Sequence, residues 1–149
     1  MAYQRTKGII DRARLFHQHI SELYERLEKI NQKEHVKMLL DYMSRHERHL
    51  AESLEEYEEE KSEKILDTWY KYTPNNESCE KLENYELKPD MSINDLVNLA
   101  MRLDECLVKL YRDVADNAES EEVRALFSSL LKKEEHEEIQ LMKNAFYLK

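Results

Sequence analysis

The chain has very little glycine: one residue among 149. Glycine-rich phosphate-binding loops, dinucleotide-binding turns and tight hairpins all need residues that tolerate positive φ angles, so these motifs are excluded. Proline is almost as scarce, with two residues. The composition therefore predicts a helical protein, and the length fits a single domain over residues 1–149 with a sizeable core.

Clustered basic residues and long apolar runs are also missing. The chain has 23 Lys and Arg against 32 Asp and Glu, which gives a formal net charge of −9. Binding to nucleic acid needs clustered Lys and Arg, so neither nucleic acid nor an anionic membrane is an expected partner. No segment approaches the ~18 consecutive apolar residues of a membrane span, and the N-terminal segment lacks the apolar core of a signal peptide. We expect a cytoplasmic protein.

The two cysteines, Cys79 and Cys106, do not form a C-x-x-C pair. Their spacing indicates neither a zinc knuckle nor a disulfide framework, and it provides no ligand pair for a rubredoxin-like iron. We expect both cysteines to be free thiols.

Apolar residues recur at alternating steps of three and four, the spacing that marks one face of an α-helix. The pattern predicts four helices, over residues 6–30, 34–69, 92–117 and 120–147. Residues 72–91 lack the pattern and contain Pro74 and Pro89, so they are expected to form a loop.

The lengths of the connections constrain the topology. A helix of about 26 residues is ~40 Å long, so the short turns after the first and third helices can only join antiparallel neighbours. A loop of about 20 residues can span up to ~65 Å when extended, which is enough to cross the length of a bundle. The sequence therefore predicts an all-α four-helix bundle, built from two antiparallel helical hairpins joined by a long crossover.

Carboxylates interrupt the apolar stripes of the third and fourth helices. Asp104 lies one turn from apolar neighbours on the third helix, and the stripe of the fourth helix runs onto Glu134, Glu137 and Glu138. A buried carboxylate is costly unless it gains a proton, a charged partner or a metal. These positions therefore predict a cation in the core.

Histidines interrupt the stripes of the first two helices, at His17, His46 and His49. The i, i+3 spacing of His46 and His49 lets two imidazoles converge on one metal ion. Glu47 faces inward about as well as His46, and His49 lies at the edge of the stripe, so Glu47 is a rival ligand for the place of either histidine.

Three segments resemble the ferritin-like, rubrerythrin-related four-helix proteins: LLDYMSRHERHLAESL, LAMRLDECLVKLYRDVAD and LFSSLLKKEEHEE. The resemblance covers nearly the whole chain. In that family, each hairpin supplies one Glu from its first helix and a Glu-x-x-His pair from its second helix to a di-iron or di-manganese centre. Carried over position by position, the resemblance implies the metal ligands His17, His46, His49, Asp104, Glu134 and Glu137.

The ligand set departs from the family pattern, because only His49 and Glu134 keep the family's residue type and Asp104 is a shortened carboxylate. A mononuclear site is therefore as plausible as a dinuclear one. The resemblance implies iron, with manganese, zinc or copper as alternatives. It also implies an oxidoreductase that uses oxygen or peroxide and an external electron donor. The alternative is a metal-free network in which imidazolium groups neutralise carboxylates, in a bundle that serves as a structural or interaction module.

Two sets of aromatic residues complete the sequence-based expectations. Trp69, Tyr70 and Tyr72, at the end of the second expected helix, either form a contact in a homodimer or cover the end of the bundle. A shift of 87 residues places Tyr24 on Tyr111. This internal repeat predicts an equivalent tyrosine near the site in each half of the chain, most simply as a packed core residue.

Overall fold

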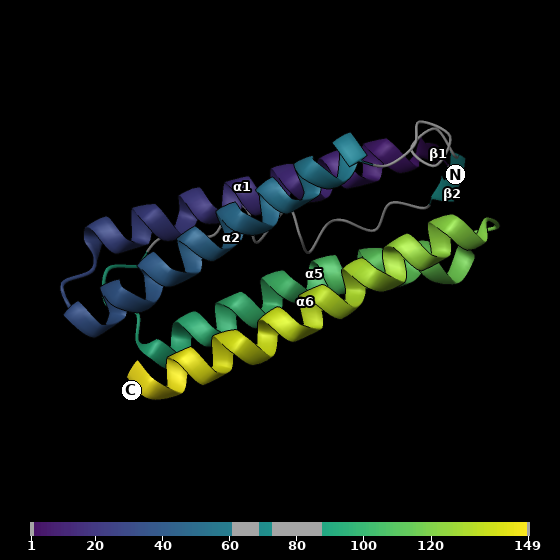
Figure 1. The fold of residues 1–149 in the computed structure, drawn as a ribbon. Coiled ribbons are helices and arrows are strands. Elements are labelled where there is room, and N and C mark those ends of the chain that lie inside the picture. The colour runs from purple at the N-terminus through teal and green to yellow at the C-terminus, as the bar shows by residue number, and fades with distance from the viewer. Residues whose placement is uncertain (1, 61–68, 73–87, 149) are drawn as a thin grey trace.

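The computed structural model describes residues 2–60, 69–72 and 88–148. Four long helices make up most of it: α1 (Thr6–Ile30), α2 (Glu34–Glu60), α5 (Ile93–Asn117) and α6 (Glu121–Leu148). Helices α1 and α2 lie side by side, as do α5 and α6, and the two pairs pack into one helical bundle (Figure 1). The expected first, third and fourth helices are confirmed to within one residue at each end.

The expected second helix is too long. Helix α2 ends at Glu60, and Trp69–Tyr72 forms strand β2, which pairs antiparallel with strand β1 (Ala2–Arg5). The prediction that the helix extends to Trp69 is therefore wrong, and the helical fold carries a two-stranded ribbon. Trp and Tyr favour strands, and a helical periodicity cannot show that this segment pairs with residues near the N-terminus. Residues 73–87 of the expected loop lie outside the described residues.

The helices form because each has one continuous apolar face, and these faces meet in a single core. Side chains from every helix are almost fully buried there, among them Ile20, Leu40, Leu103 and Phe127. Burial of one such side chain contributes roughly 1.5–3 kcal/mol. Among the described residues, no helix combines the length and the apolar character that a membrane span requires.

Asn31 holds the turn between α1 and α2 against the segment that leads into α5. Its backbone N–H donates to the Leu27 carbonyl at 3.0 Å, and its side-chain oxygen accepts from the Lys33 N–H at 3.0 Å. Its amide nitrogen donates to the Met91 carbonyl at 3.5 Å. Asn31 thereby links the two helix pairs at this end of the bundle.

Cys106, on α5, takes part in a disulfide bond, and the described residues contain no free cysteine. The expectation of a free thiol at Cys106 is therefore wrong, because the spacing of cysteines along a chain does not show which thiols meet in the fold. Cys79 lies outside the described residues.

Helix α5 begins with a reciprocal cap. The Asp95 N–H donates to the Ser92 hydroxyl at 3.1 Å, and the Ser92 N–H donates to the Asp95 carboxylate at 2.9 Å. Hydrogen bonds from the backbone and side chain of Ser92 hold the pKa of Asp95 below its ordinary value. The cap satisfies two backbone N–H groups that a helix N-terminus otherwise leaves without partners.

We expect Ser92→Ala to lower the free energy of unfolding by about 1 kcal/mol, because the Asp95 N–H loses its acceptor. Urea unfolding followed by circular dichroism measures the change. Ser128→Ala, inside α6, is the matched control and should leave stability unchanged or slightly raised, since alanine is the better helix former. Equal stability of the two variants would contradict the role of the cap.

Candidate functional site

His17 on α1 lies at the centre of a buried polar cluster. Its Nδ1 contacts Oε2 of Glu47 on α2, and its Nε2 donates to Oε1 of Glu134 on α6 at 3.0 Å. His17 is fully buried, and Glu47 and Glu134 are 8% and 4% exposed. An imidazole donates from both nitrogens only when it carries two protons. The contacts therefore describe an imidazolium bridging two carboxylates from different helices.

The electrostatics of His17 agree with this geometry. Burial by itself lowers the pKa of His17, but the charges of Glu47 and Glu134 and their hydrogen bonds outweigh burial and raise this pKa from 6.5 to about 10. The ring is therefore cationic at neutral pH, since an opposite charge within a few ångströms favours the charged form.

Asp104 on α5 joins the same cluster as a neutral group. Burial, followed by the charges of Glu47, Glu134 and Glu138, raises the pKa of Asp104 from 3.8 to about 9, although His17 acts in the opposite direction. Asp104 therefore keeps its proton at neutral pH. Two buried glutamates then face one imidazolium, and the cluster retains a net negative charge.

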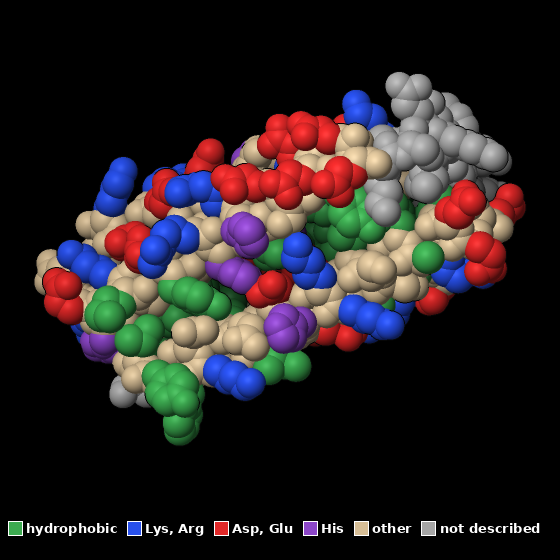
Figure 2. Space-filling model, viewed as in Figure 1, with side chains coloured by type: hydrophobic (Ala, Val, Ile, Leu, Met, Phe, Trp, Pro, Cys, Tyr) green, Lys and Arg blue, Asp and Glu red, His purple; other side chains and the backbone are tan. Residues whose placement is uncertain are grey.

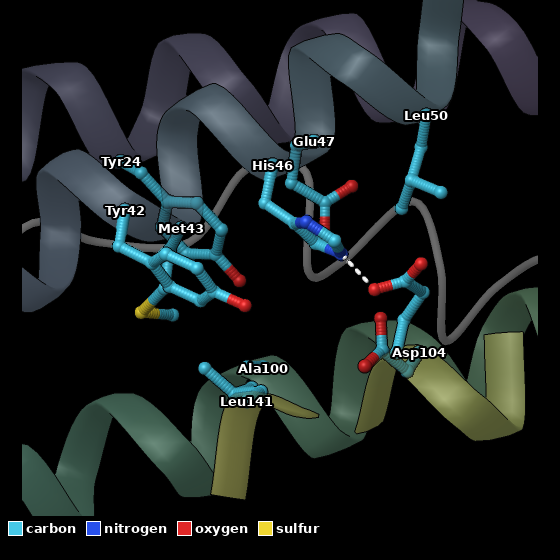
Figure 3. Close-up of a pocket in the computed structure, with 10 residues that line it drawn as sticks. Tyr24, Tyr42, Met43, His46, Glu47, Leu50, Ala100, Asp104 and Leu141 are labelled. Carbon is cyan, nitrogen blue, oxygen red and sulfur yellow. Dashed lines mark ion pairs between the residues drawn. The ribbon is translucent and has the colours of Figure 1, made fainter. Parts of the chain in front are cut away.

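A cavity of about 20 Å³ lies beside these groups and is lined by His46, Glu47, Asp104 and Glu137, together with Tyr24 and Tyr42. Figure 3 shows His46 and Glu47 on α2 lying across this space from Asp104 on α5. His46 Nε2 lies 2.5 Å from Glu137 Oε2, without hydrogen-bond alignment. The Tyr42 ring stacks on the His46 ring with centroids 5.6 Å apart. The cavity is large enough for one water molecule or one ion.

Besides His46 Nε2, two buried atoms near the cluster have no hydrogen-bond partner among the described residues: Glu134 Oε2 and the Tyr111 hydroxyl. Burial, then the charges of Glu134 and Glu47, raises the pKa of Tyr111 well above its ordinary value. Burial, then the charges of Glu47 and Asp104, does the same for Tyr24. Both phenols therefore keep their protons, and the expected pair of packed tyrosines sits on either side of the cluster.

The structure places the expected site residues at three depths. It brings His17, Asp104 and Glu134 together in the core, and His46 and Glu137 lie half-buried at the edge. His49 is exposed to solvent, away from the cluster. Glu47, the rival candidate, occupies the inward position instead. The sequence signal for it is the stripe Met43, Glu47, Leu50 and Leu54, which steps by four, three and four.

As the side chains stand, no group of three or more His, Cys, Asp or Glu within the described part of the chain is arranged to hold a metal ion. Both nitrogens of His17 are turned to carboxylates, and a ring nitrogen that carries a proton cannot ligate a metal. The donor types suit a metal, but a bound ion would require Asp104 to lose its proton and the carboxylates to move closer together.

Comparison with known proteins identifies no relative. No protein-family model matches the chain, and neither the curated proteins nor the solved structures include a match. Any function must therefore be argued from the residues of the polar cluster.

We expect His17→Ala to lower the free energy of unfolding by about 3–5 kcal/mol, because Glu47 and Glu134 would be left buried without their cation. Chemical unfolding measures the loss, and His19→Ala, an exposed histidine on the same helix, is the control. Adding Glu47→Gln and Glu134→Gln to the His17→Ala chain should recover part of the loss. A His17→Ala chain as stable as the His19→Ala chain would contradict the bridge.

The raised pKa values give stability a defined pH dependence. His17 binds its proton more tightly in the folded chain, with a pKa of about 10 against 6.5, and so does Asp104, with about 9 against 3.8. Stability falls with rising pH wherever the folded state holds more protons than the unfolded state. The contribution of His17 is complete below pH 6.5 and is lost as the pH rises through 10. Unfolding free energies of the metal-free protein should therefore decrease most steeply between pH 6.5 and 9.

Asp104→Asn isolates the contribution of Asp104 to the pH dependence of stability, because the amide resembles the protonated carboxyl and cannot ionise. We expect the stability of this variant to fall less than that of the wild type between pH 3.8 and 9. Urea midpoints measured across this range test the difference, and Asp116→Asn, an exposed position on α5, is the control. Parallel curves for the wild type and Asp104→Asn would contradict a protonated Asp104.

Proposed function

We propose that the chain binds a divalent metal ion in the core of its helical bundle. The observation that carries the proposal is the cavity of about 20 Å³ lined by His46, Glu47, Asp104 and Glu137. One imidazole and three carboxylates around a space of that size provide the nitrogen and oxygen donors that iron, manganese and zinc take in proteins. Figure 3 shows that the α2 and α5 donors face each other across this space.

The charge of the cluster supports the same assignment. Glu47 and Glu134 outweigh the single imidazolium of His17, and Asp104 avoids a further negative charge only by holding a proton. A buried excess of negative charge is unfavourable unless a cation compensates it. A divalent ion would supply that charge and displace the proton of Asp104, while Glu134 Oε2, which lacks a partner, is a further oxygen donor close by.

The finer fold that we propose is ferritin-like: two antiparallel helical hairpins joined by a crossover. Helices α1 and α2 pack side by side across the short connection 31–33, and α5 and α6 do so across 118–120. Each of the four helices supplies a polar residue to the cluster: His17, Glu47, Asp104 and Glu134. This distribution over facing helices is typical of metal sites in the cores of such bundles.

By the resemblance, iron is the first candidate for the ion, and a bound iron would supply redox chemistry toward oxygen or peroxide with an external electron donor. The residues of the chain have simpler tasks in this proposal. His17 holds Glu47 and Glu134 in place, and the exchangeable proton belongs to Asp104. Tyr42 packs against His46 and limits the positions that its ring can take.

A metal-free bundle with a structural or binding role is the second candidate. The observation that favours it is the bridge itself, because His17 uses both ring nitrogens on carboxylates and needs no metal to do so. The two candidates differ in one measurable respect: only the first requires a stoichiometric ion.

The test is metal binding by purified, chelator-treated protein. We expect the chain to bind Fe(II) under nitrogen, or Mn(II) or Zn(II), stoichiometrically by elemental analysis, and to release protons on binding because Asp104 must ionise. Asp104→Asn should weaken binding by at least about tenfold. Glu135→Gln, at an exposed position on α6, should leave the affinity unchanged. If none of these ions, nor copper, binds stoichiometrically, the metal-free bundle is the correct candidate.

A further inference from the structure

The last turns of α6 are apolar on two opposite faces. Leu141 and Ala145 are buried and belong to the core. Ile139, Met142 and Phe146 are 53%, 53% and 73% exposed. Because each residue turns an α-helix by about 100°, these three side chains fall within an arc of about 60°, opposite the buried pair. A helix that is apolar all round is normally covered all round, so this outer face indicates contact with another molecule.

Exposed apolar side chains are concentrated at this end of the bundle. Among the described residues, seven large apolar side chains are exposed, and four of them are on α6: Ile139, Met142, Phe146 and Tyr147. A fifth, Met38, is near the start of α2. The start of α2 lies at the same end of the bundle as the end of α6 (Figure 1). Figure 2 shows hydrophobic side chains gathered at this end of the molecule.

The exposed face of α6 has the spacing of a helix–helix contact. Ile139, Met142 and Phe146 follow one another at steps of three and four residues. The same steps lead backwards to Glu135 and Lys132, which are exposed as well. Side chains at these steps form the seam along which two helices pack in a coiled coil. The occupant that fits this face is therefore another helix, lying along α6.

The charges along α6 favour a second copy of the same helix. Residues 134–138, EEHEE, contain four carboxylates and no Lys or Arg. Residues 139–148, IQLMKNAFYL, contain one Lys and no carboxylate. In an antiparallel pair with a two-fold axis near Ile139, each Lys143 lies opposite the acidic segment of the other copy. A parallel pair would place the two acidic segments against each other, which is unfavourable.

Glu135 is the acidic residue best placed to meet this lysine. It is exposed on the same face as Ile139, and seven-residue spacing is not needed for the pairing because Glu135 and Lys143 lie equally far from Ile139, on either side of it. Within its own chain Glu135 pairs with Arg112 at 3.7 Å, and both side chains are about half exposed. A carboxylate accepts several hydrogen bonds, so Glu135 can also accept from a lysine of another copy.

We propose that two copies of this chain associate through the outer face of α6, in antiparallel orientation. Ile139, Met142 and Phe146 form the apolar part of the contact, and Lys143 of each copy pairs with Glu135 of the other. The contact lies on the opposite side of α6 from the buried Glu134, so it is separate from the polar cluster.

The test is the association state of the metal-free, full-length protein, measured by sedimentation equilibrium over a range of concentrations. We expect a monomer–dimer equilibrium with a dissociation constant of roughly 10–100 µM, because so short an apolar seam makes a small contact. Met142→Glu should weaken the dimer at least about tenfold, since it places a charge in the apolar seam. Leu15→Glu, at an exposed apolar residue of α1, is the matched control and should dimerise as the wild type does.

Lys143→Glu tests the orientation of the two helices. It sets a carboxylate against Glu135 of the other copy and should weaken the dimer about tenfold. Lys29→Glu, at an exposed position of α1, makes the same change in net charge and should have little effect. The double variant Glu135→Lys, Lys143→Glu exchanges the two charges and should recover most of the lost affinity. All of these positions are exposed, so circular dichroism should show an unchanged helical content.

Three results would overturn the proposal. The first is a wild-type protein that is still monomeric at about 1 mM, where even a weak specific dimer forms. The second is a dimer that Met142→Glu and Leu15→Glu affect equally, which would place the contact elsewhere. The third is equal dimerisation of Lys143→Glu and Lys29→Glu, which would contradict the antiparallel pairing. None of these results depends on whether the core binds a metal, because the measurements use the metal-free protein.

Discussion

The charge on His17 is the constraint on which the centre of this bundle depends. A fully buried imidazole carries two protons because a carboxylate from α2 lies on one nitrogen and a carboxylate from α6 on the other. Each of the three groups would be costly alone in the core, and each is acceptable only because the other two are present. The bridge also fixes the lateral positions of three helices, since a shift of any one of them would separate a buried charge from its partner.

The rest of the site follows from the unequal numbers of positive and negative charges in this bridge. One imidazolium cannot neutralise two glutamates, and the neighbouring Asp104 responds by keeping its proton. Glu134 can give only one of its oxygens to His17, which leaves the other oxygen without a partner. On one side of the bridge, the small cavity has the donors and the negative charge that suit a cation. On the other side, a larger cavity of about 120 Å³ is lined by Leu50, Leu54 and Leu130.

The sequence predicts the helices well because their apolar periodicity is a local property, and three of the four boundary pairs agree with the structure to within one residue. The pairing of Ala2–Arg5 with Trp69–Tyr72 joins distant segments, so local patterns cannot reveal it.

In the site, His17, Asp104 and Glu134 could be identified because each interrupts an apolar stripe. Helical phase decides which of Glu47 and His49 faces the core. The two residues lie about 200° apart around the helix, so with Glu47 buried, His49 is exposed to solvent. Likewise, no spacing rule predicts the disulfide of Cys106.

The most direct test of this account is the protonation state of the His17 ring, measured by ¹⁵N NMR on metal-free protein labelled at histidine. At pH 8 an ordinary histidine is neutral, with one protonated and one bare ring nitrogen. The account predicts that both ring nitrogens of His17 carry protons at this pH, with the imidazolium shifts persisting until the pH approaches 10. A His17 ring that shows one bare nitrogen at pH 8, and that titrates near 6.5 like a histidine in water, would contradict it.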